Sequence, residues 1–174
     1  TGECLPIFSF TYPPRTDKYG SSTMDGVWDN CYDAINVANS IINNIDNADI
    51  INAATFMAEA KFFRAFNYFY LVKTFGRVPL SLTAYTSGDQ EMELKRSDVS
   101  DIYTQIIQDL KDAISILPAS KWQENSHRIT RYVADQVLAS VYMQERDYVE
   151  ALPFLREIIN SGKYVLTENT DRAQ

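Results

Sequence analysis

The sequence is poor in the residues that build catalytic and metal sites. Its 174 residues include one histidine, His127, and two cysteines, Cys4 and Cys31. A zinc site needs a cluster of Cys and His residues, which this chain does not have. The six glycines form no phosphate-binding loop. We therefore expect no metal site, no cofactor and no catalytic residue, and we expect both cysteines to be free thiols, with Cys31 buried on a helix.

The chain also lacks an excess of basic charge. Sixteen basic and 23 acidic residues give a net charge of −7. Nucleic acid and anionic membrane surfaces attract clusters of Lys and Arg, so neither is an expected partner. The longest uncharged part of the aromatic segment, residues 65–72, is far shorter than the roughly 20 residues that span a bilayer. We expect a soluble chain, and no lipidation signal is recognisable around Cys4, which follows Thr-Gly-Glu.

What the sequence does contain is helical periodicity. Apolar residues recur every three or four positions in five segments, which predicts five α-helices. They cover about residues 25–46, 50–75, 97–117, 130–144 and 148–160. No strand of useful length is apparent, so the predicted fold class is all-α. Residues 1–24 form an irregular N-terminal arm, residues 25–166 the helical domain and residues 167–174 an irregular tail.

The second predicted helix is unusually aromatic. Eight Phe or Tyr rings lie between residues 56 and 75, and they fall on every side of the helix. A helix that is apolar all round is typical of a buried position, so we expect these rings to be packed in the core. Gly76 is the expected stop of this helix, and Pro79 prevents its continuation.

Polar residues on the helices give two further expectations. A row of amides on the first helix is expected to bond an adjoining loop, because a buried amide needs hydrogen-bond partners. This row comprises Asn36, Asn39 and Asn43. The acids of the third helix are expected on solvent-exposed faces. These acids are Asp98, Asp101, Asp109 and Asp112.

The last two helices are joined by so few residues that they must form an antiparallel hairpin. In them Ala139, Tyr142 and Ala151 have the small–aromatic–small spacing of a tetratricopeptide unit, in which small residues let the paired helices approach. Ala65 and Tyr68 repeat its first two elements. The pattern predicts a degenerate helical repeat, and an ordinary helix hairpin is the alternative.

Two aromatic residues in polar loops are candidate ligand contacts. Tyr85 and Trp122 could stack on the face of a sugar ring while neighbouring polar groups bond its hydroxyls. The alternative is that each ring folds back onto the helices. His127 is expected to be solvated rather than catalytic.

The stretch "AEAKFFRAFNYFYLVKTFGRVPL", residues 58–80, resembles the SusD/RagB family. In that family an Ala-Glu-Ala stretch leads into an aromatic helix containing Arg-Ala, followed by Gly, a short spacer and Pro-Leu. Three other stretches, residues 27–45, 97–118 and 132–166, resemble the neighbouring helices of the family. The hallmark-helix positions are Glu59, Arg64, Phe66, Tyr70, Gly76 and Pro79. Glu59 and Arg64 are expected to be structural and to need hydrogen-bonded partners among the aromatic rings.

The resemblance implies tetratricopeptide-like helical pairs packed as an α-α superhelix. It also implies a lipid-anchored protein on the extracellular face of the outer membrane, which binds a glycan and delivers it to a SusC-type TonB-dependent transporter. Some relatives handle peptides. Family members are usually much longer, and their lipidated cysteine is not recognisable here. The alternative function is a protein- or peptide-binding module that docks on a transporter without a sugar site of its own; an enzyme is not favoured.

Overall fold

The computed structural model describes residues 23–45, 51–85, 94–119 and 128–164. Its helices are α2 (Thr23–Asn44), α3 (Ala53–Phe75), α4 (Val99–Ile116), α5 (Arg131–Gln144) and α6 (Tyr148–Asn160). Within these residues the only strand-like pairing is an isolated bridge between Pro79 and Arg96. The predicted all-α class is confirmed. Most of the predicted N-terminal arm, the tail, Cys4, Trp122 and His127 lie outside the described residues.

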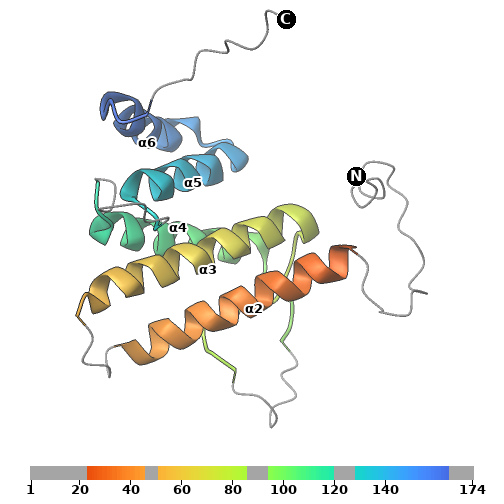
Figure 1. Ribbon diagram of the computed structural model, residues 1–174. Coiled ribbons are helices and arrows are strands. Elements are labelled where there is room, and N and C mark those ends of the chain that lie inside the picture. The colour runs from red at the N-terminus through yellow and green to blue at the C-terminus, as the bar shows by residue number, and fades with distance from the viewer. Residues whose placement is uncertain (1–22, 46–50, 86–93, 120–127, 165–174) are drawn as a thin grey trace, which may run out of the picture.

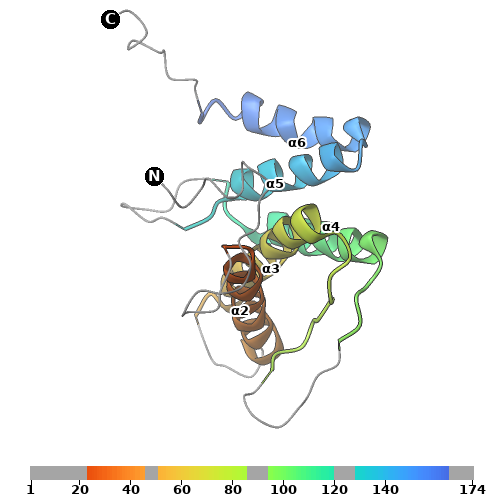
Figure 2. The ribbon, with the colours of Figure 1, turned by 90° about the vertical axis from the view of Figure 1, so that its right-hand side faces the viewer.

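The helices form a stack in chain order. Each helix packs against the next one in the chain, from α2 to α6, and α3 also contacts α5. Figures 1 and 2 show α5 between α4 and α6, and α3 between α2 and α4. This nearest-neighbour arrangement is typical of helical repeats.

The helix ends follow the predicted signals closely. Gly76 adopts a φ of 70° at the end of α3, where its N–H donates to the carbonyl oxygen of Val72. A positive φ carries no steric penalty for glycine, which explains why the helix ends there. Asp98 precedes α4 and Leu117 follows it, and α6 has the predicted bounds. The α3 helix begins at Ala53, three residues later than expected.

The repeat positions are buried as the tetratricopeptide spacing predicts. Ala139 and Ala151, on α5 and α6, have almost no exposed surface, and Tyr142 stacks on Phe154. Ala65 and Tyr68 on α3 are completely buried. Small side chains at these positions allow the backbones to approach, and the ring of Tyr142 fills the space beside them. Cys31 is a free, buried thiol on α2, as expected.

The expectation that all eight rings of α3 are buried is wrong for four of them. Phe62, Tyr68 and Phe69 are in the core, and Phe75 is partly covered. Four other rings are 38–50% exposed: Phe56, Phe63, Phe66 and Tyr70. Their spacings of seven, three and four residues place them on one face of the helix. The described neighbours α2 and α4 leave that face uncovered.

The expectation of a solvent-exposed Asp109 is also wrong, because its side chain lies in the core. Asp109 is 1% exposed and accepts two hydrogen bonds of 2.8 Å from Nε and Nη2 of Arg64. Arg64 Nη1 donates to Oδ1 of Asn39 at 2.9 Å. Asp109 lies three residues after Ile106 and four residues before Ala113, so all three are on the same face of α4. One polar cluster therefore joins α2, α3 and α4.

The amide row of α2 holds the segment that follows α3, as predicted for two of its three members. Asn39 Nδ2 donates to the carbonyl oxygens of Ser81 and Thr83 at 3.1 and 3.2 Å. Asn36 bonds both the N–H and the carbonyl oxygen of Tyr85. Asn43 is exposed. The side chain of Tyr68 is buried, and this burial raises the pKa of Tyr68 to about 12. The phenol group therefore keeps its proton and donates to the carbonyl oxygen of Ser81 at 2.8 Å.

We predict that Arg64→Met costs about 3–5 kcal/mol of unfolding free energy, because it leaves the carboxylate of Asp109 buried without a counter-charge. The matched control is Lys61→Met, which breaks the Lys61–Asp112 pair between the same two helices. That pair is partly solvated, so its loss should cost below about 1 kcal/mol. Urea unfolding at pH 7 measures both values. Equal losses for the two variants would contradict the proposed importance of the buried pair.

Candidate functional site

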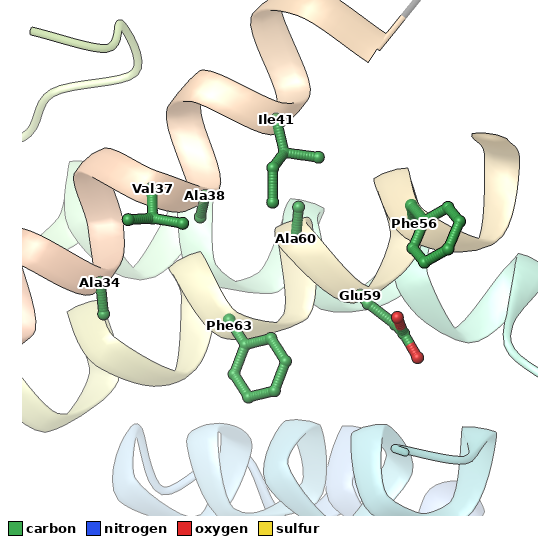
Figure 3. Close-up of a pocket in the computed structure, with 8 residues that line it drawn as sticks. All are labelled: Ala34, Val37, Ala38, Ile41, Phe56, Glu59, Ala60 and Phe63. Carbon is green, nitrogen blue, oxygen red and sulfur yellow. The ribbon is translucent and has the colours of Figure 1, made fainter. Parts of the chain in front are cut away.

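An apolar groove lies between α2 and α3, with a volume of about 330 Å³. We call it the α2–α3 groove. Figure 3 shows its two sides, one formed by α2 and the other by α3. Eight residues line it: Ala34, Val37, Ala38, Ile41, Phe56, Glu59, Ala60 and Phe63. Seven of the eight side chains are apolar, so the groove suits apolar side chains of a ligand or partner.

The groove follows from the size of the residues along two helix faces. Ala34 and Ala38 are one turn apart on α2, and Ala60 lies opposite on α3. These methyl groups leave space between the helix backbones. The larger side chains of Val37, Ile41 and the α3 rings stand at the rim and remain exposed. Small residues inside and large residues at the rim produce the hollow.

Glu59 is the only charged residue among the eight described residues that line the groove, and its charge is paired. Arg128 donates from Nε to Oε1 of Glu59 at 2.8 Å and from Nη2 to Oε2 at 3.0 Å. The guanidinium also lies 5.1 Å from the ring centre of Phe56. The hydrogen bonds to Glu59 raise the pKa of Arg128, so the guanidinium stays charged. Arg64 and Glu59 therefore both have hydrogen-bonded partners.

The other hallmark positions of α3 have clear locations. Phe66 and Tyr70 extend the exposed aromatic face of α3 beyond the groove. The carbonyl oxygen of Pro79 accepts a hydrogen bond of 2.7 Å from the hydroxyl of Tyr32. Gly76 ends the helix. The structural roles assigned to these residues from the sequence remain proposals, since no ligand or variant tests them.

The described residues include only one of the two predicted ligand contacts. Tyr85 is half-buried, and its main chain is held by Asn36 at 2.7 Å. Its phenol oxygen is buried and bonds no residue that the structure describes. Trp122 lies outside the described residues, so ligand stacking by either ring stays a prediction.

A second hollow, of about 350 Å³, lies at the α5–α6 hairpin, and we call it the α5–α6 hollow. Its lining residues are Tyr132, Val133, Gln136, Val137, Ile158 and Tyr164. The rings of Tyr132 and Tyr164 meet edge to face, with centres 5.9 Å apart. Lys163 lies over the ring of Tyr132 at 5.3 Å. Apart from one amide and two phenol groups, this hollow is also apolar.

Two kinds of site are not found in the described part of the chain. No group of three or more His, Cys, Asp or Glu residues there could hold a metal ion. Among the same residues, no helix has the length and apolar character needed to cross a bilayer.

Comparison with known proteins then places the fold in a family. A sequence model of SusD-like proteins, described as "Starch-binding associating with outer membrane", matches residues 12–143. The chain belongs to the SusD-like family. This confirms the resemblance of the α3 hallmark stretch to SusD/RagB proteins.

Individual relatives agree with this assignment. The chain is 29% identical over 153 residues to a SusD-like protein of Formosa agariphila, covering 84% of this chain and 28% of the relative. It is 31% identical over 126 residues to a SusD-like protein of Bacteroides ovatus, covering 69% of this chain and 22% of the relative. The chain thus spans about a quarter of the length of the curated relatives it matches.

A solved structure named "Laminarin binding SusD-like protein" superposes with a TM-score of 0.78. It is 26% identical to this chain, and the match covers 92% of this chain and 35% of that one. The SusD-like chain therefore has the tetratricopeptide-like helical fold that the repeat spacing and the resemblance predicted.

Several residues of these sites were not identified from the sequence. The α2–α3 groove depends on which faces of α2 and α3 meet, which periodicity does not specify. Asp109 carried a usable signal, because it lies on the apolar face of its helix rather than on the polar one. An acid in such a position is expected to be buried and to have an unusual environment.

We predict a large difference between two adjacent rings of α3. Phe62→Ala should cost about 3–5 kcal/mol, because Phe62 is in the core. Phe63→Ala should cost less than roughly 1.5 kcal/mol, because Phe63 is half exposed at the rim of the groove. Urea unfolding of both variants measures the difference. Comparable losses would mean that Phe63 is buried in solution and that the groove is not open.

Proposed function

We propose that this protein binds a glycan at the outer face of the outer membrane and delivers it, without catalysis, to a SusC-type TonB-dependent transporter. The supporting observation is the family match over residues 12–143, whose description names starch binding and the outer membrane. The likeness to a laminarin-binding relative at a TM-score of 0.78 supports the same role. A membrane contact would be made through a lipid anchor rather than through these helices.

In this proposal the described helices are the scaffold, and the loops carry the sugar contacts. A sugar ring needs both a flat apolar surface and several hydrogen-bonding groups. The α2–α3 groove has the first but offers only the already paired Glu59 as a polar group. Tyr85 and Trp122 therefore remain the proposed sugar contacts. Asn36 and Asn39 support this division, because they attach the chain from Ser81 to Tyr85 to the scaffold.

One observation favours a second function, a docking module for protein or peptide. The α2–α3 groove and the exposed rings of Phe66 and Tyr70 form a surface of aromatic and aliphatic side chains. Protein interfaces are enriched in such aromatic anchors. In this alternative the groove contacts the transporter or a peptide, and the chain has no sugar site of its own.

Affinity gel electrophoresis in laminarin and in starch tests the first function. We predict that at least one glucan retards the chain. Trp122→Ala and Tyr85→Ala should each weaken the affinity about tenfold, equivalent to about 1.4 kcal/mol, because a stacking ring is lost. The matched control is Tyr148→Ala, which removes an exposed ring at the start of α6 and should leave retardation unchanged.

The outcomes separate the two functions. Retardation that is unchanged in the Trp122 and Tyr85 variants would support glycan binding but refute these two contacts. No retardation by any polysaccharide, together with retention of an identified TonB-dependent transporter in a pull-down that Phe63→Ala weakens, would favour the docking module.

A further inference from the structure

The helix α6 is attached to the other described helices by one contact surface. Among the described helices, α6 packs only against α5. Ala151 is its only buried residue, and Val149 and Ile159 are 80% and 73% exposed. A helix with so few buried apolar side chains opens more readily than the core helices do. The position of α6 therefore depends on the groups at the α5–α6 contact.

A carboxylate that accepts no hydrogen bond from any described residue is buried beside this contact. Asp135 on α5 is 0% exposed, and neither of its oxygens accepts a hydrogen bond from a residue that the structure describes. Arg131 Nε lies 3.7 Å from Oδ2 of Asp135, which is too far for a hydrogen bond. Arg131 Nη2 lies 3.6 Å from Oε1 of Glu157 on α6. One guanidinium thus stands between two carboxylates, and the cluster keeps an excess negative charge.

This environment disfavours the ionised form of Asp135. The pKa of Asp135 is raised to about 6, mainly by burial; the charge of Arg131 lowers this pKa and the charge of Glu157 raises it. On the other side of α5, the helix α4 contributes Lys111, whose ammonium group lies over the ring of Tyr142 at 5.9 Å. From α3, the carboxylate of Glu59 is held by Arg128. Neither group pairs with Asp135.

We propose that protonation of Asp135 strengthens the packing of α6 on α5, so that the hairpin is a pH-sensitive element of the scaffold. Without its charge, the carboxyl group no longer has to be buried as an anion that accepts no hydrogen bond from a described residue. The α5–α6 hollow is built from both helices, since Tyr132 and Val137 come from α5 and Ile158 from α6. Opening of α6 would therefore change the hollow as well.

The sign of the effect follows from linkage. The pKa of Asp135 is about 6 in the folded protein and 3.8 in the unfolded chain. The stabilisation by the neutral form is fully present below about pH 3.8 and is lost as the pH rises through about 6. Between pH 5 and pH 7.5 the opening equilibrium of α6 should rise about tenfold for this reason.

Hydrogen–deuterium exchange with mass spectrometry, corrected for the intrinsic exchange rate at each pH, measures this opening in the 174-residue chain. In the wild type we expect the α6 peptide to open about tenfold more at pH 7.5 than at pH 5, relative to an α3 peptide. Asp135→Asn should abolish this difference. The control Asp101→Asn, an exposed acid on α4, should retain it.

An equal pH response in the wild type and in Asp135→Asn would overturn the proposal. If Asp135→Asn does not fold, the pKa of Asp135 can be measured directly in the wild-type protein. The side-chain carboxyl carbon of Asp135 is followed by NMR between pH 3 and pH 8. A midpoint near 6 supports the proposal, and a midpoint near the ordinary aspartate value of about 4 refutes it.

Discussion

The buried pair of Arg64 and Asp109 is the interaction on which the rest of the scaffold depends. Two parallel hydrogen bonds of 2.8 Å fix the relative position of α3 and α4, and the third donor of Arg64 reaches Asn39 on α2. The amide of Asn39 then holds the carbonyl oxygens of Ser81 and Thr83. Removing two charges from water is costly, so such a pair stabilises only a geometry that satisfies every donor and acceptor. The pair therefore specifies the arrangement of three helices and one loop segment more than it adds to the stability of the fold.

In this scaffold, polar side chains join the helices in the interior, and apolar side chains are exposed on the outer face of α3. On α3, Arg64 and Tyr68 point into the core and bond neighbouring elements, whereas Phe63, Phe66 and Tyr70 face outward. Alanines between α2 and α3 leave the α2–α3 groove open, and the pairing of Glu59 with Arg128 neutralises its one charged lining residue. This division fits the proposed function, in which the helices position the loops and contact partners. It also explains why the aromatic helix carries more rings than the core uses.

Much of the fold could be predicted from the sequence because its helices have strong local signals. Gly76 and the spacing of Ala139, Tyr142 and Ala151 act through local sterics, and the structure confirms them. Asp98 stands at the predicted start of α4, but its side chain makes no capping hydrogen bond. The hallmark stretch of α3 identified the family, which the comparisons confirm.

The predictions that failed concern which side chains are covered by a neighbouring helix, and not where the helices lie in the sequence. A ring on α3 is buried only if another helix covers it, and Asp109 is buried only because Arg64 lies opposite. Periodicity does not contain that information, although the position of Asp109 on an apolar face indicated it. The predicted sugar contact Trp122 lies outside the described residues, and Tyr85 has not been tested.

A double-mutant cycle on the buried pair tests the central claim most directly. Urea unfolding is measured for Arg64→Met, Asp109→Leu and the double variant. If the two charges are mutually compensating in the core, the double variant should lose roughly 2 kcal/mol less than the sum of the two single losses, because no unpaired charge remains buried. Losses that add within about 0.5 kcal/mol would show that the two residues act independently. That result would contradict the view that this pair organises the helices of the SusD-like scaffold.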